Sequence, residues 1–551
     1  MKNLQDLAAA ITKATIAPPP GLAFTPARFA ILLRSNQDPA TKRDEIASRL
    51  ASIKPSATVR FASPQEMRVV IAEFTTRSFA ASDEADIFAA AYTMTDVLDV
   101  EAAEPDLPVG FFPQQPRSAA PKEPVPEGLG AFPSGCWAPA EPTLDARPRW
   151  AIEAMRVPEA WQFSEQKQRP SRGAGIVIAQ PDTGITKHFE LDNVVESNPA
   201  NILNHTGDPT DPLDEDGIWD NPGHGTGTAS VAVSPEADQV YGAAPKASHM
   251  SIRAVDSILR ITQVSVAAAV DWAVDHGAHV ITMSLGGLPS FTLHRAIRRA
   301  IGADIIVMAA AGNCVKLVVW PARYDDCIAV AGTDSASQAW RGSCQGSSVS
   351  VSAPAQNVYR ARAARNEAPS SGQGQGTSFS VALTAGVAGL WLAHHGRANL
   401  VAAARARGET LQTMFKRLVK ATAQRPPNWD SFNLGAGIVD ARALLEADLD
   451  VGRERESAPV PDVDAERSKI AIQSFVLESA GNAESLQADL DWMRFGPEIA
   501  FRILRSRLQP AVRSESAGLH GLSVSHELNE SAQSKRLRDL LGLPKAEVMF
   551  E

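Results

Sequence analysis

Between residues 149 and 446, short apolar runs alternate with segments of helical periodicity. The runs expected to be strands are Gly175–Ala179, Met250–Val255, Val280–Leu285, Asp304–Ala309, Ile328–Ala331 and Val349–Ser352. Between two of these runs, Val266, Val270 and Val274 recur at helical spacing, and Gly277 is placed to end that helix. Strands that alternate with helices form a mostly parallel sheet covered on both faces. The region is therefore predicted to be an α/β domain with a doubly wound, mostly parallel sheet.

A smaller α+β domain is predicted upstream, over residues 27–104. Its pattern predicts strands over 29–33, 59–61, 67–74 and 97–100, and helices over 41–53 and 85–92. The order strand, helix, strand, strand, helix, strand is typical of a ferredoxin-like arrangement.

The remaining segments differ in composition from these two domains. Residues 1–26 are expected to be a leader, and residues 105–148, which are rich in Pro, Gly and Ala, an extended linker. Residues 447–468 are charged and contain proline, which indicates a second linker. Residues 469–551 are helical in tendency and carry no chemical signal.

Composition limits the classes of partner. The chain has 551 residues and a net charge of −10, which argues against nucleic acid because a phosphate-binding face needs clustered Lys and Arg. The sequence has no run of 18 or more apolar residues, so no membrane span is predicted. The first 20 residues lack the continuous apolar stretch of a signal peptide, so we expect a cytoplasmic protein or export by a non-standard route.

Cysteine usage excludes a fold built on disulfides, because the chain has only four: Cys136, Cys314, Cys327 and Cys344. Cys314 and Cys327 flank a short segment and could pair, although free buried thiols are favoured in a reducing compartment. No Cys or His spacing predicts a zinc site, and no cofactor is expected.

Three short segments place a reactive side chain where a parallel sheet exposes its ligand-binding edge. In the first, an apolar strand ends at Asp182 and a glycine-bearing turn follows. In the second, glycines flank His224. In the third, a glycine-rich turn places Ser378 in the first turn of an apolar helix. Backbone N–H groups at a helix start favour developing negative charge.

Each of these residues also has an ordinary structural interpretation. A strand-ending Asp is often a turn or cap residue, a single His is usually on the surface or satisfied in the core, and a Ser before a helix is commonly its N-cap. A phosphate loop is a further alternative for 374–378, but the segment lacks the Walker lysine and the G-x-G-x-x-G spacing.

Together the segments resemble the subtilase family. The family signatures match Asp182-Thr-Gly184, Gly223-His-Gly-Thr226 and Gly376-Thr-Ser378, in the chain order Asp, His, Ser known for subtilisin. Further similarity lies in the segments 280–287, 309–313, 318–322, 327–332 and 435–441. One departure is Ala382, which stands where the family usually has proline four residues after the nucleophile.

The resemblance implies a serine endopeptidase that acts on protein or peptide substrates. Asp182, His224 and Ser378 would form the catalytic triad, and the reaction would pass through an acyl-enzyme. Asn313 would donate to the oxyanion. A catalytically silent protein that holds a peptide in the same groove is the alternative from another functional class.

The resemblance also assigns the substrate groove. Extended substrate would pair with Ser284, Leu285 and Gly286. Ala310, Ala311 and Gly312, in the segment that resembles the family's oxyanion-hole segment, are also assigned to substrate binding. Val319 falls where the floor of the S1 pocket is often glycine, which predicts a shallow pocket for small or medium apolar side chains.

Two more expectations follow from the family. The 27–104 domain resembles the family's inhibitory propeptide, which implies a self-processing zymogen cut within 102–149, with the N-terminal domain as an intramolecular inhibitor. A permanently attached accessory domain is the alternative. Calcium is common in the family, and the acidic loop Asp208–Asp220 is its candidate site here, although such loops are often simply solvated.

Overall fold

The structure is a computed structural model. It describes residues 3–18, 24–79, 84–107, 136, 147–213, 222–256, 262–453, 464–480 and 491–508. The predicted linker 105–148, the acidic loop, the linker 447–468 and the end of the chain lie wholly or partly outside these residues.

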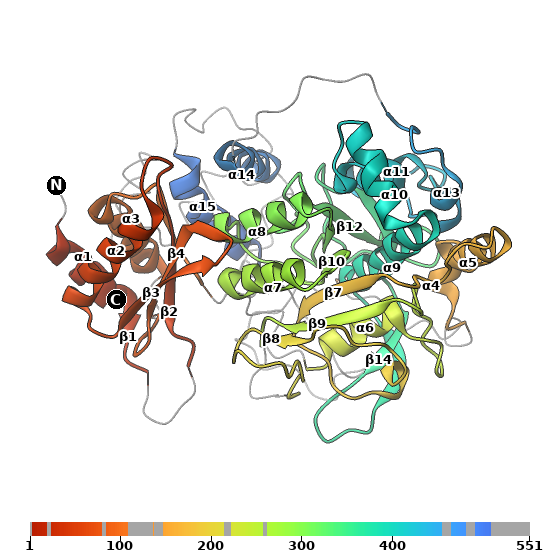
Figure 1. Cartoon of the computed structure of the whole chain (residues 1–551), viewed down its shortest axis with the longest axis horizontal. Helices are drawn as coiled ribbons and strands as arrows, with labels where there is room; N and C mark the ends of the chain where they lie inside the picture. Colours follow the sequence, from red (N-terminus) through yellow and green to blue (C-terminus); the bar gives the residue numbers. More distant parts are fainter. Residues whose placement is uncertain are drawn as a thin grey trace, which may run out of the picture.

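The N-terminal domain is an α+β sandwich at the left of Figure 1. Its elements are α1 (Leu4–Ala14), β1 (Thr15–Ile16), β2 (Ala27–Leu32), α2 (Pro39–Ile53), β3 (Ala57–Ser63), β4 (Glu66–Phe74), β5 (Ser78–Phe79), α3 (Glu84–Leu98) and β6 (Ala102–Pro105). The strand order β3-β4-β2-β6 is antiparallel throughout, and the four main strands and two helices follow the predicted order. The predicted position of the last strand, 97–100, is wrong: α3 continues to Leu98, and the strand is β6.

The expectation that residues 1–26 form a separate leader is wrong. Asn3 caps α1 by accepting hydrogen bonds from the N–H groups of Gln5 and Asp6. Leu7 and Ile11 lie four residues apart on one face of this helix, and both are fully buried in the core of the N-terminal domain. Helix α1 packs against α3, so the start of the chain belongs to the N-terminal domain.

The central domain is built on a seven-stranded sheet of order β13-β12-β11-β10-β7-β9-β8. Its strands are β7 (Val177–Asp182), β8 (Ala200–Asn201), β9 (Ser248–Arg253), β10 (Val280–Met283), β11 (Ile306–Ala310), β12 (Ile328–Thr333) and β13 (Val351–Pro354). All pairs in this sheet are parallel, and the six predicted strands are all present. The short strand β8 and the antiparallel hairpin of β14 (Val358–Arg362) and β15 (Ser370–Gly374) were not predicted.

Helices cover both faces of this sheet. They are α4 (Trp150–Ala154), α5 (Val157–Gln166), the 3₁₀ turn η1 (Phe189–Leu191), α6 (His224–Val233), α7 (Gln263–Asp275), α8 (Phe291–Gly302), α9 (Thr377–His395), α10 (Arg397–Ala406), α11 (Leu411–Ala421), α12 (Ser431–Leu434) and α13 (Ala441–Glu446). The strand pattern explains the two layers: along β10, Ile281 and Met283 pack with α7 and α8, whereas Val280 packs with α9 on the other face.

Helix α9 has the length and hydropathy of a membrane span, but the whole stretch is buried inside the central domain. It contacts β10, β11, β12 and β13, and it is therefore the core helix of that face.

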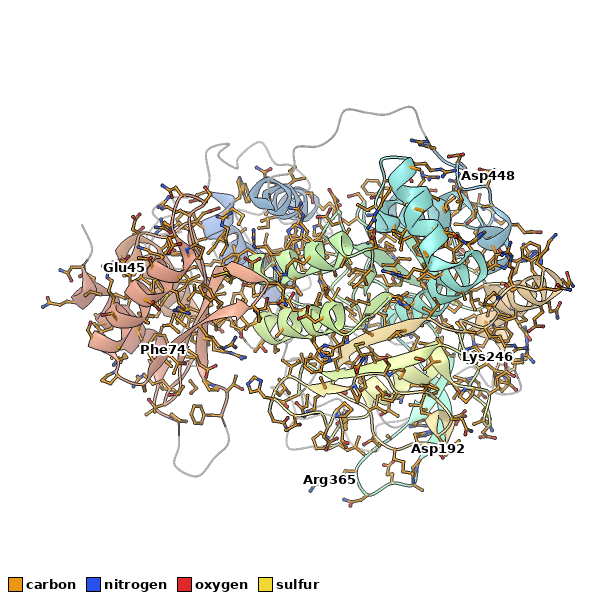
Figure 2. All side chains as sticks on the ribbon, viewed as in Figure 1. Glu45, Phe74, Asp192, Lys246, Arg365 and Asp448 are labelled. Carbon is orange, nitrogen blue, oxygen red and sulfur yellow. A yellow bond between two sulfur atoms is a disulfide. The ribbon has the colours of Figure 1, made fainter. Side chains whose placement is uncertain are left out.

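Two helices of the C-terminal region are described, α14 (Asp464–Ala480) and α15 (Trp492–Leu508). They confirm the helical tendency there, while the helical residues predicted at 486–490 and 537–541 lie outside the described ranges. Figure 1 shows α14 and α15 between the N-terminal and central domains, and α7 and α8 between the two sheets. In Figure 2, Phe74 lies in the N-terminal domain, whereas Lys246 and Asp448 lie on the far side of the central domain.

The expectation of free buried thiols holds for Cys327 and Cys344 but is wrong for Cys314, and the alternative pair Cys314–Cys327 does not form. Cys314 instead forms a disulfide with Cys136, at a Cα–Cα distance of 5.6 Å, and Cys327 and Cys344 are free and buried. Cys327 lies just before the buried strand β12, and its Sγ contacts the carbonyl of Val307. The tertiary structure, and not the short separation of Cys314 and Cys327 in the sequence, therefore determines which cysteines pair.

Candidate active site

The chain order of the sheet creates a crevice at the carboxyl ends of β7 and β10. From β7 the chain continues to β8 and β9 on one side, and then returns to place β10 on the other. Ligands of doubly wound sheets bind where the strand order reverses in this way. Asp182 is the last residue of β7, and Ser284 directly follows β10.

Asp182 is buried, with 1% of its surface exposed. Its Oδ1 accepts from the Thr183 N–H at 2.7 Å and lies 2.7 Å from Nδ1 of His224. The first bond is the local turn contact that the structural alternative expected. The second joins this carboxylate to an imidazole 42 residues away.

His224 opens helix α6 directly after Gly223, which has a φ of +73°. A Cβ at Gly223 would lie 2.4 Å from the carbonyl oxygen of Ala363, so the turn requires glycine for space as well as for conformation. The imidazole Nε2 lies 3.2 Å from Oγ of Ser378. His224 therefore bridges Asp182 and Ser378.

Ser378 is the second residue of α9, and it does not cap that helix. The N-cap is Gly376, which makes no side-chain cap bond. The Ser378 Oγ contacts His224 and lies 3.4 Å from the carbonyl oxygen of Ser284. The interpretation of Ser378 as an ordinary N-cap is therefore wrong.

Asn313 follows β11 and is held by Thr377. Its Oδ1 accepts from the Thr377 N–H at 3.0 Å and from the Thr377 Oγ1 at 2.9 Å. Because both bonds use the amide oxygen, the amide orientation is fixed and the Nδ2 donor faces the other way. A Cβ built at Gly376 would lie 3.6 Å from Asn313 Nδ2 and 3.8 Å from the Ser378 backbone nitrogen, so these two donors border one small space.

Polar residues outside the sequence prediction support this arrangement. The Asp211 carboxylate accepts from Thr183 Oγ1 at 2.7 Å and from the Gly223 N–H at 2.9 Å, so it joins the turns that carry Asp182 and His224. Burial raises the pKa of Asp211.

A second supporting residue, Gln180, lies on β7 beside Asp182. Its Nε2 donates to Thr228 Oγ1 at 2.7 Å and to the Gly225 carbonyl at 3.0 Å. A glutamine inside a buried apolar strand is a signal that sequence reasoning could have used.

The residues predicted for substrate binding lie around the same crevice. Ser284 Oγ donates to the Ser378 carbonyl at 3.1 Å, and the Val319 N–H donates to the Ala311 carbonyl at 3.1 Å. The segment 284–287 contacts the segment 318–320 through the bond from the Gly287 N–H to the Trp320 carbonyl, at 2.7 Å. Val319 is fully buried.

The described residues contain no group of three or more His, Cys, Asp or Glu side chains arranged for a metal ion. In the acidic loop, Asp208 accepts from the N–H and hydroxyl of Thr210, and Asp211 is occupied as described above. Residues 214–221 of this loop lie outside the described ranges, and calcium there stays a prediction.

Comparison with known proteins agrees with this geometry. The Subtilase family model matches residues 173–437. Thermitase from Thermoactinomyces vulgaris is 34% identical over 266 residues, which are 47% of this chain and 87% of thermitase. Subtilisin BL from Lederbergia lenta is 31% identical over 212 residues, 38% of this chain and 72% of that protein.

A solved structure also shares the fold. The crystal structure of fervidolysin from Fervidobacterium pennivorans, described as a keratinolytic enzyme related to subtilisin, matches with a TM-score of 0.51 and 19% identity. The match covers 79% of this chain and 63% of that chain. Taken with the identity to thermitase and the match to the family model, it shows that the chain belongs to the subtilase family and has the subtilisin-like α/β fold.

Proposed function

We propose that this subtilisin-like serine endopeptidase hydrolyses peptide bonds with Ser378 as nucleophile, His224 as general base and Asp182 as the residue that orients His224. The observation that carries the proposal is the position of the imidazole, with Nδ1 2.7 Å from Asp182 Oδ1 and Nε2 3.2 Å from Ser378 Oγ. A serine hydroxyl is a poor nucleophile at neutral pH, and a base in this position activates it.

The steps follow from these contacts. His224 accepts the proton of Ser378 as Oγ attacks the substrate carbonyl, and Asp182 stabilises the resulting imidazolium. His224 then gives the proton to the leaving amine, which leaves an acyl-enzyme on Ser378. Water activated by the same imidazole hydrolyses the acyl-enzyme and restores the free serine.

The charge on the tetrahedral intermediate requires donors at a fixed position. Asn313 Nδ2 and the Ser378 N–H are suited to this role because they border the same space, and because Thr377 holds the Asn313 amide in one orientation. Preorganised donors of this kind need no rearrangement during the reaction.

We further propose that the enzyme is made as a zymogen. The support is the docking of the N-terminal domain on the helices beside the crevice. Glu104 accepts from Ser290 Oγ at 2.7 Å and from the Phe291 N–H at 3.1 Å at the start of α8, and Asp106 accepts from the Val264 N–H at 3.0 Å in α7. These acceptors satisfy N–H groups at the starts of the two helices, which have no partner within the helix.

Hydrolysis of a casein or mixed-peptide substrate tests the catalytic assignment. The wild type is expected to cleave it, and Ser378→Ala and His224→Ala are each expected to lower kcat by about 10⁴-fold or more, with KM little changed. Lys246→Ala, at an exposed side chain on the far side of the central domain (Figure 2), is the control and should leave kcat unchanged. A wild type that binds peptide without cleaving it would favour the catalytically silent alternative.

Intact-mass analysis tests the zymogen proposal. The wild type should be cut within residues 102–149, whereas Ser378→Ala should stay full length. If both remain full length after prolonged incubation, the N-terminal domain is a permanent accessory domain.

A further inference from the structure

Helix α14 is anchored on the central domain by a contact between two aromatic rings. Phe475 of α14 and Trp320 of the central domain are both fully buried, and their ring centroids lie 4.8 Å apart. Trp320 adjoins Val319, so α14 contacts the segment that carries the predicted S1 floor. Buried aromatic pairs of this kind dominate the energy of an interface.

A buried arginine of the central domain is directed at the same helix. Arg323 is 1% exposed, and it donates to Glu478 Oε2 at 2.8 Å, to Ser474 Oγ at 3.2 Å and to the Ala471 carbonyl at 3.3 Å. All three acceptors belong to α14. Because a buried guanidinium is costly without such partners, this surface of the central domain is built to be covered by α14.

Helix α15 is anchored on the other domain. The Tyr92 Oη of α3 donates to Glu498 Oε2 at 2.6 Å, and the rings of Tyr92 and Phe495 lie 4.9 Å apart. The rings of Phe88 and Phe501 lie 5.6 Å apart. Burial and the neighbouring Glu498 carboxylate raise the pKa of Tyr92 well above its ordinary value, so it is a hydrogen-bond donor at neutral pH.

The rim of the α15 contact is charged. Arg494 pairs with Asp96 at 2.6 Å and donates to the Tyr92 carbonyl at 2.8 Å. These contacts join α15 to the N-terminal domain through apolar, hydrogen-bonded and ionic interactions at one place.

The two helices also pack against each other. A Cβ at Gly496 of α15 would lie 2.7 Å from Cδ1 of Ile472 of α14, so the glycine permits close contact between the helices. One continuous apolar core contains Phe88 of the N-terminal domain, Phe475 and Phe495 of the C-terminal helices, and Trp320 of the central domain. Figure 1 shows this C-terminal pair in blue between the two domains.

The N-terminal and central domains also contact each other directly. In a small buried apolar cluster, Leu32 and Ile71 of the N-terminal sheet pack with Phe291 of α8. Glu66 pairs with Arg295 at 2.7 Å and with Arg299 at 2.6 Å. Beside these ion pairs lies a cavity of about 600 Å³, lined from both domains by residues such as Arg60 and Asp271. The direct interface therefore combines a small apolar cluster with ion pairs and a cavity beside them.

We propose that α14 and α15 form a clasp that holds the N-terminal domain on the central domain independently of the linker between them. When the linker is cut, the N-terminal domain stays in place until the clasp detaches from α3 or from the surface around Trp320 and Arg323. The clasp holds the N-terminal domain even in a catalytically inactive chain. Its consequence, that a processed enzyme stays latent, rests on the proposed function.

Retention of a severed N-terminal domain tests the clasp. The full chain carries Ser378→Ala and an inserted recognition site for a sequence-specific protease between residues 120 and 121. After cleavage of that site, size-exclusion chromatography measures how fast the N-terminal fragment separates from the remainder. Phe495→Ala and Phe475→Ala should each speed separation about tenfold or more, because one weakens the N-terminal side of the clasp and the other the central side.

Two further variants keep the test independent of misfolding. Ile470→Ala changes an exposed residue of α14 (38% exposed) and should separate as slowly as the parent. Tyr92→Phe keeps the ring and removes only the bond to Glu498, and it should give a smaller acceleration at unchanged circular dichroism. Equal separation rates in the parent, Phe475→Ala, Phe495→Ala and Tyr92→Phe would overturn the clasp.

A final experiment distinguishes a failure of the clasp proposal from a failure of the proposed catalytic function. In the Ser378-containing chain with a cut linker, Phe495→Ala should release peptidase activity faster than Ile470→Ala. Faster separation without any activity in either variant would support the clasp and contradict the catalytic assignment. Activity that appears at the same rate in both variants would contradict the clasp as a source of latency.

Discussion

At the residue scale, the most informative detail is the way Thr377 holds Asn313. Both hydrogen bonds from Thr377 go to the amide oxygen, so the amide nitrogen is left for substrate. Residue identity alone indicated Asn313, because it lies in a family-like segment. The orientation could not be predicted, because Thr377 lies 64 residues away on another element.

Asn313→Ala should lower kcat by about 10²–10³ with little change in KM, which is the loss found when the equivalent donor of subtilisin is removed. The reason is that Asn313 Nδ2 contacts the oxyanion and not the ground-state carbonyl. Steady-state kinetics on a chromogenic peptide provide the measurement. Thr377→Ser keeps both bonds and is the matched control; an equal loss in Thr377→Ser would show that the site is sensitive to any change there.

Val319→Gly should change the preference for the residue before the cut bond. The valine side chain is fully buried at the predicted S1 floor, and its removal should deepen the pocket. In a peptide library, the wild type should favour Ala and Val, and the variant should gain activity toward Phe and Tyr by about tenfold or more. A wild type that cleaves efficiently after Phe, Tyr or Arg but not after Ala would contradict the shallow pocket.

At the scale of helices and strands, the sequence predicts the elements whose residues follow a regular apolar pattern. The parallel strands and α7 follow from runs of apolar residues, and their order along the chain was therefore predictable. Strand β15 has the sequence Ser-Ser-Gly-Gln-Gly and shows no apolar alternation, so its pairing with β14 depends on the tertiary structure. The sequence pattern does not identify α1 as part of the N-terminal domain, because Leu7 and Ile11 pack against α3, about 80 residues downstream.

The start of α8 predicts a pH-dependent docking of the N-terminal domain. Burial raises the pKa of Glu104 from 4.5 to about 7, although Ser290, Phe291 and Thr292 donate to the carboxylate. After undocking, the group is expected to return toward 4.5. A raised pKa in the docked state means that docking is strongest below about pH 4.5 and weakens as pH rises through 7.

Separation of the severed N-terminal domain in Ser378→Ala should therefore become faster between pH 5 and pH 8, by up to about a hundredfold. Glu104→Gln, which removes the titrating group, should flatten this dependence. An unchanged pH profile in Glu104→Gln would show that another group controls it.

At the scale of the whole molecule, three parts of the chain meet beside the crevice. The N-terminal domain packs on α7 and α8, the C-terminal helices join both domains, and the disulfide attaches Cys136 beside Asn313. None of these contacts was predictable from local patterns, because each joins residues more than 100 positions apart. The expectation of a cytoplasmic protein, or of export by a non-standard route, stays a prediction.

Thiol counting checks the disulfide. Alkylation of the unfolded, unreduced chain should modify two cysteines, Cys327 and Cys344, and prior reduction should raise the number to four. Cys136→Ser should leave three reactive thiols without reduction. Four modified cysteines in the unreduced wild type would contradict the Cys136–Cys314 bond.

The central claim is that Asp182, His224 and Ser378 act as one unit, and covalent labelling with a fluorophosphonate tests it most directly. Mass spectrometry of peptides from the labelled enzyme, after its linker is cut and the N-terminal fragment removed, should locate a single adduct on Ser378. Labelling should be lost in Ser378→Ala and strongly slowed in His224→Ala. An adduct on another serine, or equal labelling of the wild type and His224→Ala, would contradict the account.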